Sequence, residues 1–413
     1  MKIAILSDFH FGFGYNTELE NDSFDNAEEA MNKALDSNLI LLAGDIFDSR
    51  APRTEVWARA IKILVKPLLI KDVEINPVSC SKKLKKISNR TLNSLPVLAI
   101  HGTHERRGRG EINVIEALEN AGILIHLHQD LIIFEKDGVK VAIHGMSGVP
   151  ESYAKDVLYK WNPKPVEECF NILLLHQSIE PYVYSPLQPP SLNLSNLPKG
   201  FDLIVNGHLH IANQEKIGNT TLLFPGSLVV TQLEVNEALA DKGFFELELE
   251  IDGEKKINFR KLETNRKFFY EDLKLDESYI REKIERKIEQ ILLKGFSKPP
   301  LIKFKITGKE TEILDKDFRG IERKYSGKAI INFVKELESP EITRKIEFLR
   351  NLREQKLSVE ETGLKILKRS LEELNFKSSF DYDKIFSLLN EGKVERVFNI
   401  LIGEQETLEK WTK

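Results

Sequence analysis

The sequence predicts an α/β protein: a β-sandwich flanked by helices, followed by a small α/β domain and a helical C-terminal tail. Two observations support this class. Residues 1–260 alternate short apolar runs with helix-like stretches, and from residue 261 the chain becomes richer in charged side chains. At about 150 residues per domain, 413 residues are enough for two or three domains. We expect domains at residues 1–262, 263–340 and 341–413.

The composition argues against several classes of protein. Lys and Arg total 60 and Asp and Glu total 64, a net charge of −4, so any contact with nucleic acid must be local. Two cysteines are too few for a disulfide framework or a thiolate zinc cage. No apolar run is long enough to cross a membrane, and residues 1–8 lack a signal-peptide pattern. We therefore expect a cytoplasmic protein with no membrane partner.

Three segments of the first domain have helical periodicity. They are residues 23–37, with a cap at Asp22 or Ser23, then residues 54–64 and 112–120. From residue 217 to residue 262 the pattern alternates, which predicts strands throughout. Four apolar residues share one face of the second helix, which is either a core face or a candidate homodimer interface: Val56, Ala60, Ile63 and Leu64.

The rest of the chain predicts a small α/β domain and a helical tail. Apolar residues recur every four positions from Ile280 to Leu292, and a strand pattern follows at residues 301–306. The tail ends in a helical pair at residues 382–390 and 393–402. Five apolar side chains exceed what this pair can hide and predict a docking face for a partner helix: Phe386, Leu389, Val397, Phe398 and Leu401.

Five apolar runs in the first domain end in Asp or His. Sites in α/β sheets form beyond the carboxyl ends of strands, so these side chains should meet at one edge. Carboxylate and imidazole ligands without thiolate favour Mn, Fe, Co, Ni or Zn at a catalytic site. Asp45 is the candidate to bridge two cations, as in two-metal phosphoryl transfer. The residues concerned are Asp8, His10, Asp45, His104, His176, His208 and His210.

Each motif alone has an ordinary structural explanation. An Asp-x-His pair arises by chance in a chain of this length, residues 44–48 could cap a helix, and residues 207–210 could form a turn. His104 and His176 could be satisfied loop or core histidines. The strand ends taken together favour a dinuclear metal site. The histidines left outside it are His101, His126, His128 and His144.

The order and form of these motifs resemble the calcineurin-like metallophosphoesterases. The motifs are Asp-x-His at residues 8–10, Gly-Asp-x-x-Asp at 44–48, Gly-x-His-Glu at 102–105, His176, and Gly-His-x-His at 207–210. With the small domain and the tail, the chain is most similar to the archaeal nucleases of that family, which form the nuclease subunit of the double-strand-break repair complex. The resemblance implies a metallophosphoesterase sandwich with a capping domain at residues 263–340.

The resemblance also implies two Mn²⁺ ions per chain. His104 would not bind metal; it would stabilise the charge that develops at phosphorus or protonate the leaving oxygen. The ligands of one ion would be Asp8, His10, Asp45 and His210, and those of the other Asp45, His176 and His208.

Thr103 departs from the family, which usually has Asn at this position as a ligand of the second metal. A hydroxyl is a poorer ligand than an amide oxygen, so Thr103 either ligates weakly or leaves the place to water. The arginines that follow, Arg106, Arg107 and Arg109, are candidates for contact with DNA phosphate, because the arginine fork suits it. A solvated charged loop is the alternative.

The function that the resemblance implies is a manganese-dependent DNA exonuclease and endonuclease. It would cut phosphodiester bonds at DNA ends and in single strands during double-strand-break repair. The implied partners are a coiled-coil ATPase, bound by the C-terminal helical pair, and a second copy of the chain in a homodimer. Two alternatives stay open: a scaffold for that ATPase with an impaired metal site, and a phosphodiesterase for small phosphoesters.

Overall fold

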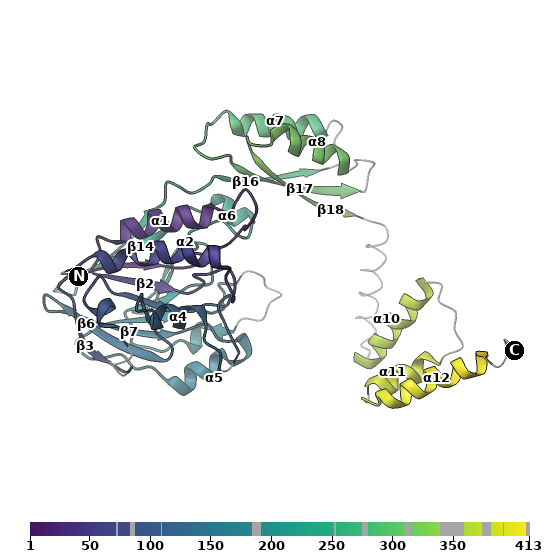
Figure 1. Ribbon diagram of the computed structural model, residues 1–413, viewed down its shortest axis with the longest axis horizontal. Coiled ribbons are helices and arrows are strands. Elements are labelled where there is room, and N and C mark those ends of the chain that lie inside the picture. Colours follow the sequence, from purple (N-terminus) through teal and green to yellow (C-terminus); the bar gives the residue numbers. More distant parts are fainter. Residues whose placement is uncertain are drawn as a thin grey trace. The chain divides into compact units, whose positions relative to one another are not determined.

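The computed structural model describes residues 1–71, 73–82, 87–108, 110–183, 191–251, 253–274, 280–309, 315–338, 359–373, 381–390 and 392–409 (Figure 1). The chain divides into two compact units. The first comprises Met1–Leu273, Glu277–Ile306 and Ile313–Lys335, and the second contains the tail from residue 336. The expected boundary at residue 262 lies inside the first unit and stays a prediction.

Two β-sheets form the centre of the first unit. The six-stranded sheet has the order β15-β14-β1-β2-β4-β5, with β1 (Lys2–Leu6), β2 (Leu39–Ala43), β4 (Val97–Ile100), β5 (Ile125–His126), β14 (Gly243–Leu249) and β15 (Lys255–Lys261). The seven-stranded sheet has the order β12-β13-β11-β8-β7-β6-β3, with β3 (Asn76–Cys80), β6 (Asp130–Lys136), β7 (Val139–Met146), β8 (Phe170–Leu175), β11 (Leu203–Asn206), β12 (Asn213–Ile217) and β13 (Thr220–Phe224). A pair of two-residue strands, β9 (Ile179–Glu180) and β10 (Leu192–Asn193), forms a separate two-stranded sheet.

The two sheets pack face to face. Ile5 of β1 and Leu41 of β2 belong to one buried cluster with Ile172 of β8 and Val205 of β11. Their neighbours Leu6 and Leu42 point the other way, into a second cluster with the helices. Strands buried on both faces explain why the sequence shows short continuous apolar runs.

Helices cover both outer faces of the sandwich. On the six-stranded sheet lie α1 (Asp22–Ala34), α2 (Thr54–Leu64) and α4 (Val114–Asn120), and on the other sheet lies α5 (Glu151–Trp161). The short helices are η1 (Lys66–Leu69), α3 (Asn89–Leu92) and η3 (Leu194–Asn196). The expected sandwich flanked by helices is confirmed.

Two of the three predicted helices begin at residues other than those predicted, and the second agrees with its prediction. The prediction for α2 is confirmed to the residue, and all four apolar residues of its shared face are buried in the core. That face therefore packs in the chain's own core, which is one of the two alternatives that the sequence leaves open. The predicted caps of α1 are wrong, because Asp22 and Ser23 lie inside the helix and Asn21 precedes it. The third helix begins at Val114 because Asn113 forms a capping box with Glu116.

Residues 217–262 are not all strands, contrary to the prediction. A loop and a short helix, α6 (Val235–Leu239), separate β13 from β14. The side chain of Glu237 accepts hydrogen bonds from the backbone N–H groups of Thr231, Gln232 and Leu233. These donors are therefore not available to a strand ladder, and the chain turns.

The small α/β part of the first unit is also confirmed. Its sheet has the order β16-β17-β18, with β16 (Phe268–Lys274), β17 (Leu301–Lys309) and β18 (Ile330–Glu338), and its helices are α7 (Ile280–Leu292) and α8 (Asp315–Tyr325). Ile280, Ile284 and Ile288 of α7 are buried, as the four-residue spacing predicts.

The second unit is helical where it is described. It contains α10 (Val359–Glu373), α11 (Tyr382–Asn390) and α12 (Val394–Glu409). Of the five predicted docking residues, Phe386 is half-buried and packs near Gly363, and Val397 is buried. The other three are exposed: Leu389 (48%), Phe398 (61%) and Leu401 (38%). Across the described residues, helices are too short or too polar to cross a membrane.

Candidate metal centre

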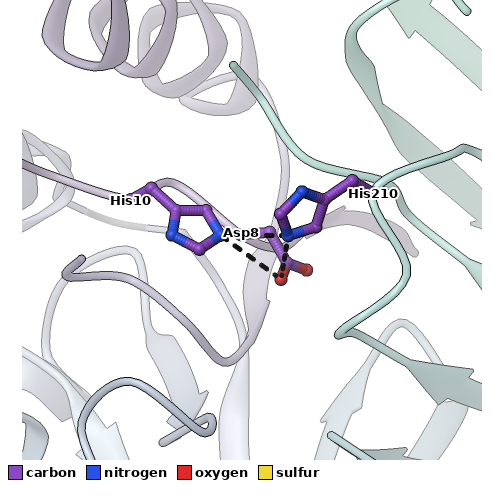
Figure 2. A group of neighbouring side chains, drawn as sticks. All are labelled: Asp8, His10 and His210. Carbon is purple, nitrogen blue, oxygen red and sulfur yellow. Dashed lines mark hydrogen bonds and ion pairs between the residues drawn. The ribbon is translucent and has the colours of Figure 1, made fainter. Parts of the chain in front are cut away.

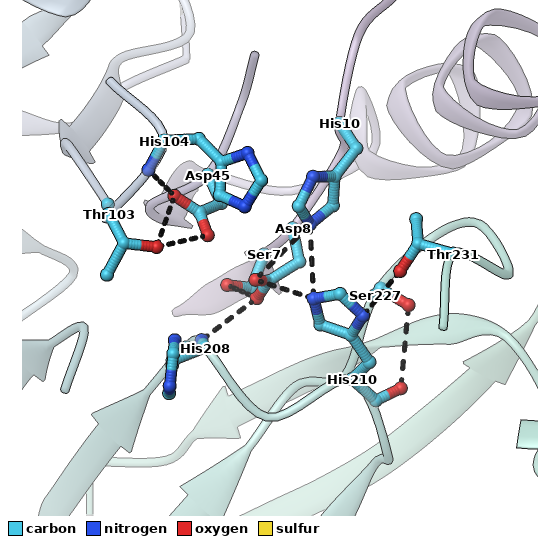
Figure 3. Close-up of polar contacts among 12 residues, drawn as sticks. Ser7, Asp8, His10, Asp45, Thr103, His104, His208, His210, Ser227 and Thr231 are labelled. Carbon is cyan, nitrogen blue, oxygen red and sulfur yellow. Dashed lines mark hydrogen bonds and ion pairs between the residues drawn. The ribbon is translucent and has the colours of Figure 1, made fainter. Parts of the chain in front are cut away.

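The structure brings the predicted ligands together at one edge of the sandwich. β1, β2 and β4 are parallel neighbours in one sheet, and β8 and β11 are parallel neighbours in the other. Their carboxyl ends therefore point the same way within each sheet. The loops after these strands supply the side chains of the site, most of which Figure 3 shows: Asp8, His10, Asp45, Thr103, His104, His176, His208 and His210.

Asp8, His10 and His210 form the first group of candidate ligands (Figure 2). Nε2 of His10 lies 3.1 Å from Nε2 of His210, and these atoms lie 3.8 and 3.5 Å from Oδ1 of Asp8. Among the described residues, this buried oxygen has no hydrogen-bond partner. A buried carboxylate oxygen without a hydrogen bond, facing two imidazole nitrogens, fits a divalent cation.

Asp45, His176 and His208 form the second group. Nε2 of His176 is 3.1 Å from Oδ2 of Asp45, while its Nδ1 is 2.7 Å from the carbonyl oxygen of Ala43. That carbonyl oxygen accepts a hydrogen bond from Nδ1–H, which leaves Nε2 as the atom that can bind a metal. The predicted second bond from Asp45, to the first ion, stays a prediction.

Thr103 and His104 contact Asp45 directly. The hydroxyl of Thr103 donates to Oδ2 of Asp45 at 3.1 Å, and the backbone N–H of His104 donates to Oδ1 at 2.9 Å. The ring of His104 is 42% exposed and stands edge-on to the ring of His10. His104 is thus placed beside the ligands, at the solvent side of the site.

The sequence reasoning missed two residues of the site. Asp48 accepts a hydrogen bond from Nδ1 of His10 at 2.9 Å, which turns Nε2 of that ring toward the first group. Glu105 is fully buried and accepts the backbone N–H groups of Phe47 and Gly102, so it joins the loops after β2 and β4. Both residues belong to the motifs that the sequence displays, and this was the only signal for them.

The charges of the site favour a bound cation. Burial raises the pKa of the Asp45 carboxyl, but His176 and His10 hold it well below its usual value. Burial lowers the pKa of His176, but Asp45 and Asp8 raise it to about 10. Burial lowers the pKa of His208 to about 4, so this ring is neutral at pH 7. In the metal-free protein, His176 is therefore protonated at pH 7. Its positive charge balances the carboxylates of Asp45 and Asp8, as a bound cation would.

The backbone is shaped to let these side chains converge. Four of the candidate ligands have left-handed backbone torsions: Asp8 (φ 52°), His10 (49°), Asp45 (48°) and His208 (74°). Side chains other than glycine rarely adopt this conformation, which costs about 1–3 kcal/mol per residue. A Cβ atom at Gly102 would lie 2.1 Å from Oδ1 of Asp45, so this position requires glycine.

Of the three arginines predicted to contact DNA, two lie in the described part of the chain. Arg106 is 3.6 Å from Glu151 of α5, and Arg107 is exposed. Arg109 lies outside the described residues. Among the described groups of potential ligands, none includes His101, His126, His128 or His144. His101 instead lies against His126, with 3.1 Å between Nδ1 and Nε2.

Comparison with known proteins defines the class. Residues 1–212 match the sequence profile of the calcineurin-like phosphoesterases, and this is half of the chain. The chain therefore belongs to the calcineurin-like phosphoesterase family, a class of hydrolases, and its clustered carboxylates and imidazoles fit the divalent metals of that family.

Several proteins that are similar to this chain in sequence are named as double-strand break repair proteins. The chain is 26% identical over 288 residues to the DNA double-strand break repair protein Mre11 of Methanopyrus kandleri, a match that covers 64% of this chain and 58% of that protein. It is 26% identical over 316 residues to the Mre11 of Thermoplasma acidophilum, covering 73% and 76%. The match to the double-strand break repair protein mre-11 of Caenorhabditis elegans is 25% identical over 292 residues and covers 62% and 40%. The chain thus spans about half the length of several relatives.

Proposed function

We propose that this chain is a manganese-dependent nuclease that cuts phosphodiester bonds at DNA ends and in single strands during double-strand-break repair. One observation carries the proposal: two groups of side chains that could each hold a metal ion lie together at the edge of a phosphoesterase sandwich. The choice of DNA as substrate is supported by the relatives, which are named as double-strand break repair proteins.

The chain's own residues would hold two Mn²⁺ ions. When bound, the ions would supply positive charge at the phosphate and polarise its oxygens. Asp48 and the carbonyl of Ala43 would orient the ligands His10 and His176. The first ion would be held by Asp8, His10, Asp45 and His210, and the second by Asp45, His176 and His208, with Thr103 beside it.

His104 would act on the phosphate and not on the metals. Its Nδ1 lies 3.0 Å from the carbonyl oxygen of Asp48, which accepts a hydrogen bond from this nitrogen. In the protonated ring, Nε2–H is then the group that can donate to the phosphate or to the leaving oxygen. Arg106, Arg107 and Arg109 would contact the DNA backbone near this ring.

The partners would bind through residues other than those of the metal groups. The exposed residues Leu389, Phe398 and Leu401 would dock on the coiled coil of an ATPase, and Phe386 and Val397 would hold the helices that present them. A homodimer is proposed as well, with an interface other than the buried face of α2.

Metal content and activity, measured on the same sample, test the proposal. We expect bound Mn²⁺ and cutting of duplex and hairpin DNA that exceeds hydrolysis of a small chromogenic phosphodiester. DNA binding without metal would instead favour the scaffold, and hydrolysis of the small diester alone would favour the small-substrate enzyme.

Asp45→Ala should abolish cutting, because it removes the carboxylate of the second group. The matched control is Asp36→Ala, which changes an exposed residue and should cut normally. Near-normal activity of Asp45→Ala would contradict the assignment.

A further inference from the structure

A buried ion pair lies behind His210 and takes no part in the two ligand groups. The side chains of Lys242 and Glu237 are only 1% and 3% exposed, and Nζ lies 2.7 Å from Oε1. Burying two charges has a large desolvation cost, and apolar side chains would fill the same space without it. The hydrogen bonds of Lys242 and Glu237 show which parts of the chain this ion pair fixes.

Lys242 holds the main chain of the candidate metal ligand His210. Its ammonium group donates to Oε1 of Glu237, to the hydroxyl of Ser227 at 2.7 Å, and to the carbonyl oxygen of His210 at 3.0 Å. These three bonds match the three protons of the ammonium group. The backbone of His210 is thus fixed by a charged donor from the end of a different loop.

Glu237 holds the loop that reaches the ring of His210. Its Oε2 accepts the N–H groups of Thr231 at 3.2 Å, Gln232 at 2.7 Å and Leu233 at 3.2 Å. The hydroxyl of Thr231 then lies 2.7 Å from Nδ1 of His210 (Figure 3). With Nδ1 occupied in this way, Nε2 is the nitrogen that faces Asp8 and His10.

We propose that Glu237, Lys242 and Thr231 are positioning residues for His210. Lys242 fixes its main chain, and Glu237 fixes Thr231, whose hydroxyl accepts a hydrogen bond from Nδ1 and so leaves Nε2 as the atom that would bind the metal. Partners of this kind behind a metal-binding histidine typically change metal affinity 10–100-fold. The inference rests on the two-metal site of the proposed function and not on its DNA substrate.

Thr231→Val tests the last link, because valine keeps the shape and loses the hydroxyl. In Mn²⁺ titrations followed by electron paramagnetic resonance of the free ion, we expect one of the two affinities to fall about tenfold. Thr231→Ser should restore it. The matched control is Thr91→Val, which removes a buried hydroxyl that donates to the carbonyl of Gly122 and should leave both affinities unchanged.

The pair itself is tested by changing both charges. In Glu237→Gln with Lys242→Met, the amide oxygen can still accept the three N–H groups, while the bond to the carbonyl of His210 is lost. We expect a folded protein, by its metal-free thermal midpoint, with the same single affinity weakened. Wild-type affinities in Thr231→Val, or an equal loss in Thr91→Val, would overturn the inference. A wild-type protein that binds no Mn²⁺ would overturn the proposed function with it.

Discussion

His104 differs from the other histidines of the site in its exposure to solvent and in the metal groups it could join. Among the described residues, it shares a possible metal-binding group with His10 and Asp48 alone, and its ring is 42% exposed. His104→Ala should therefore lower turnover by about 10²-fold or more, the range for a lost acid or charge stabiliser, with Mn²⁺ retained. Turnover and metal content are measured on one preparation. Loss of metal together with activity would make His104 a ligand.

Thr103 gives a second prediction at this scale. Its hydroxyl donates to Asp45, at the position where the family resemblance implies the amide oxygen of Asn. Thr103→Asn should shift the manganese activation midpoint downward, by about tenfold if the amide adds roughly 1.4 kcal/mol of binding free energy. Thr103→Ser keeps the hydroxyl and should leave the midpoint in place. An unchanged or higher midpoint in Thr103→Asn would refute the idea of a weak second site.

The sequence predicted which residues meet at the site, but not what holds them there. Asp8, Asp45 and His176 follow strands, and parallel strands bring such positions to one edge whatever the loops do. The partners Asp48 and Thr231 act through hydrogen bonds across 38 and 21 residues of chain. Spacing along one sequence does not encode such bonds, so these roles required the structure.

Some apolar residues of the helical pair in the tail are buried, and others are exposed to solvent. Val397 is buried, whereas Phe398 and Leu401 are exposed on the same helix, α12. Deletion of residues 375–413 should abolish binding to the coiled-coil ATPase and leave manganese-dependent cutting of simple substrates. A pull-down and a nuclease assay measure the two effects.

Single changes on α12 sharpen the experiment. Phe398→Ser should weaken the pull-down, and Glu395→Ala, an exposed change one turn earlier, should not. If the ATPase is still captured after the deletion, the partner site lies elsewhere.

Elements were predictable where the apolar spacing was regular, and less so where polar side chains compete for the backbone. The spacing in α2 predicted both of its ends. In residues 217–262 the alternating pattern predicts strands throughout. In the structure, Glu237 accepts three backbone N–H groups, which are then not available to hydrogen bonds between strands. A carboxylate that acts over four to six residues is not visible as a period in the sequence.

For the whole molecule, buried histidines predict how stability depends on pH. Burial lowers the pKa of His101 to about 3 and those of His144 and His208 to about 4. In the unfolded chain these groups titrate near 6.5, so between pH 6.5 and 4 the unfolded state binds more protons and the folded state loses stability as the pH falls.

The opposite sign applies above neutrality. His176, with its pKa raised to about 10 by Asp45 against the effect of burial, adds stability that is complete below pH 6.5 and is lost as the pH rises toward 10. The thermal midpoint of the metal-free protein should thus be highest near pH 6–7. His144→Gln should flatten the acid side, since His144 lies outside the metal groups. An acid side as steep as in the wild type would contradict this account.

The left-handed torsions of the candidate ligands bear on how this protein could be evolved in the laboratory. At His208, glycine would adopt the observed torsion without the penalty of about 1–3 kcal/mol that a side chain carries there. A library screened only for survival of heating would therefore be enriched in variants that have lost a ligand. Such a screen would reward inactive proteins and report them as improved. At this position, the backbone torsion that places a metal ligand also lowers the thermal stability of the fold.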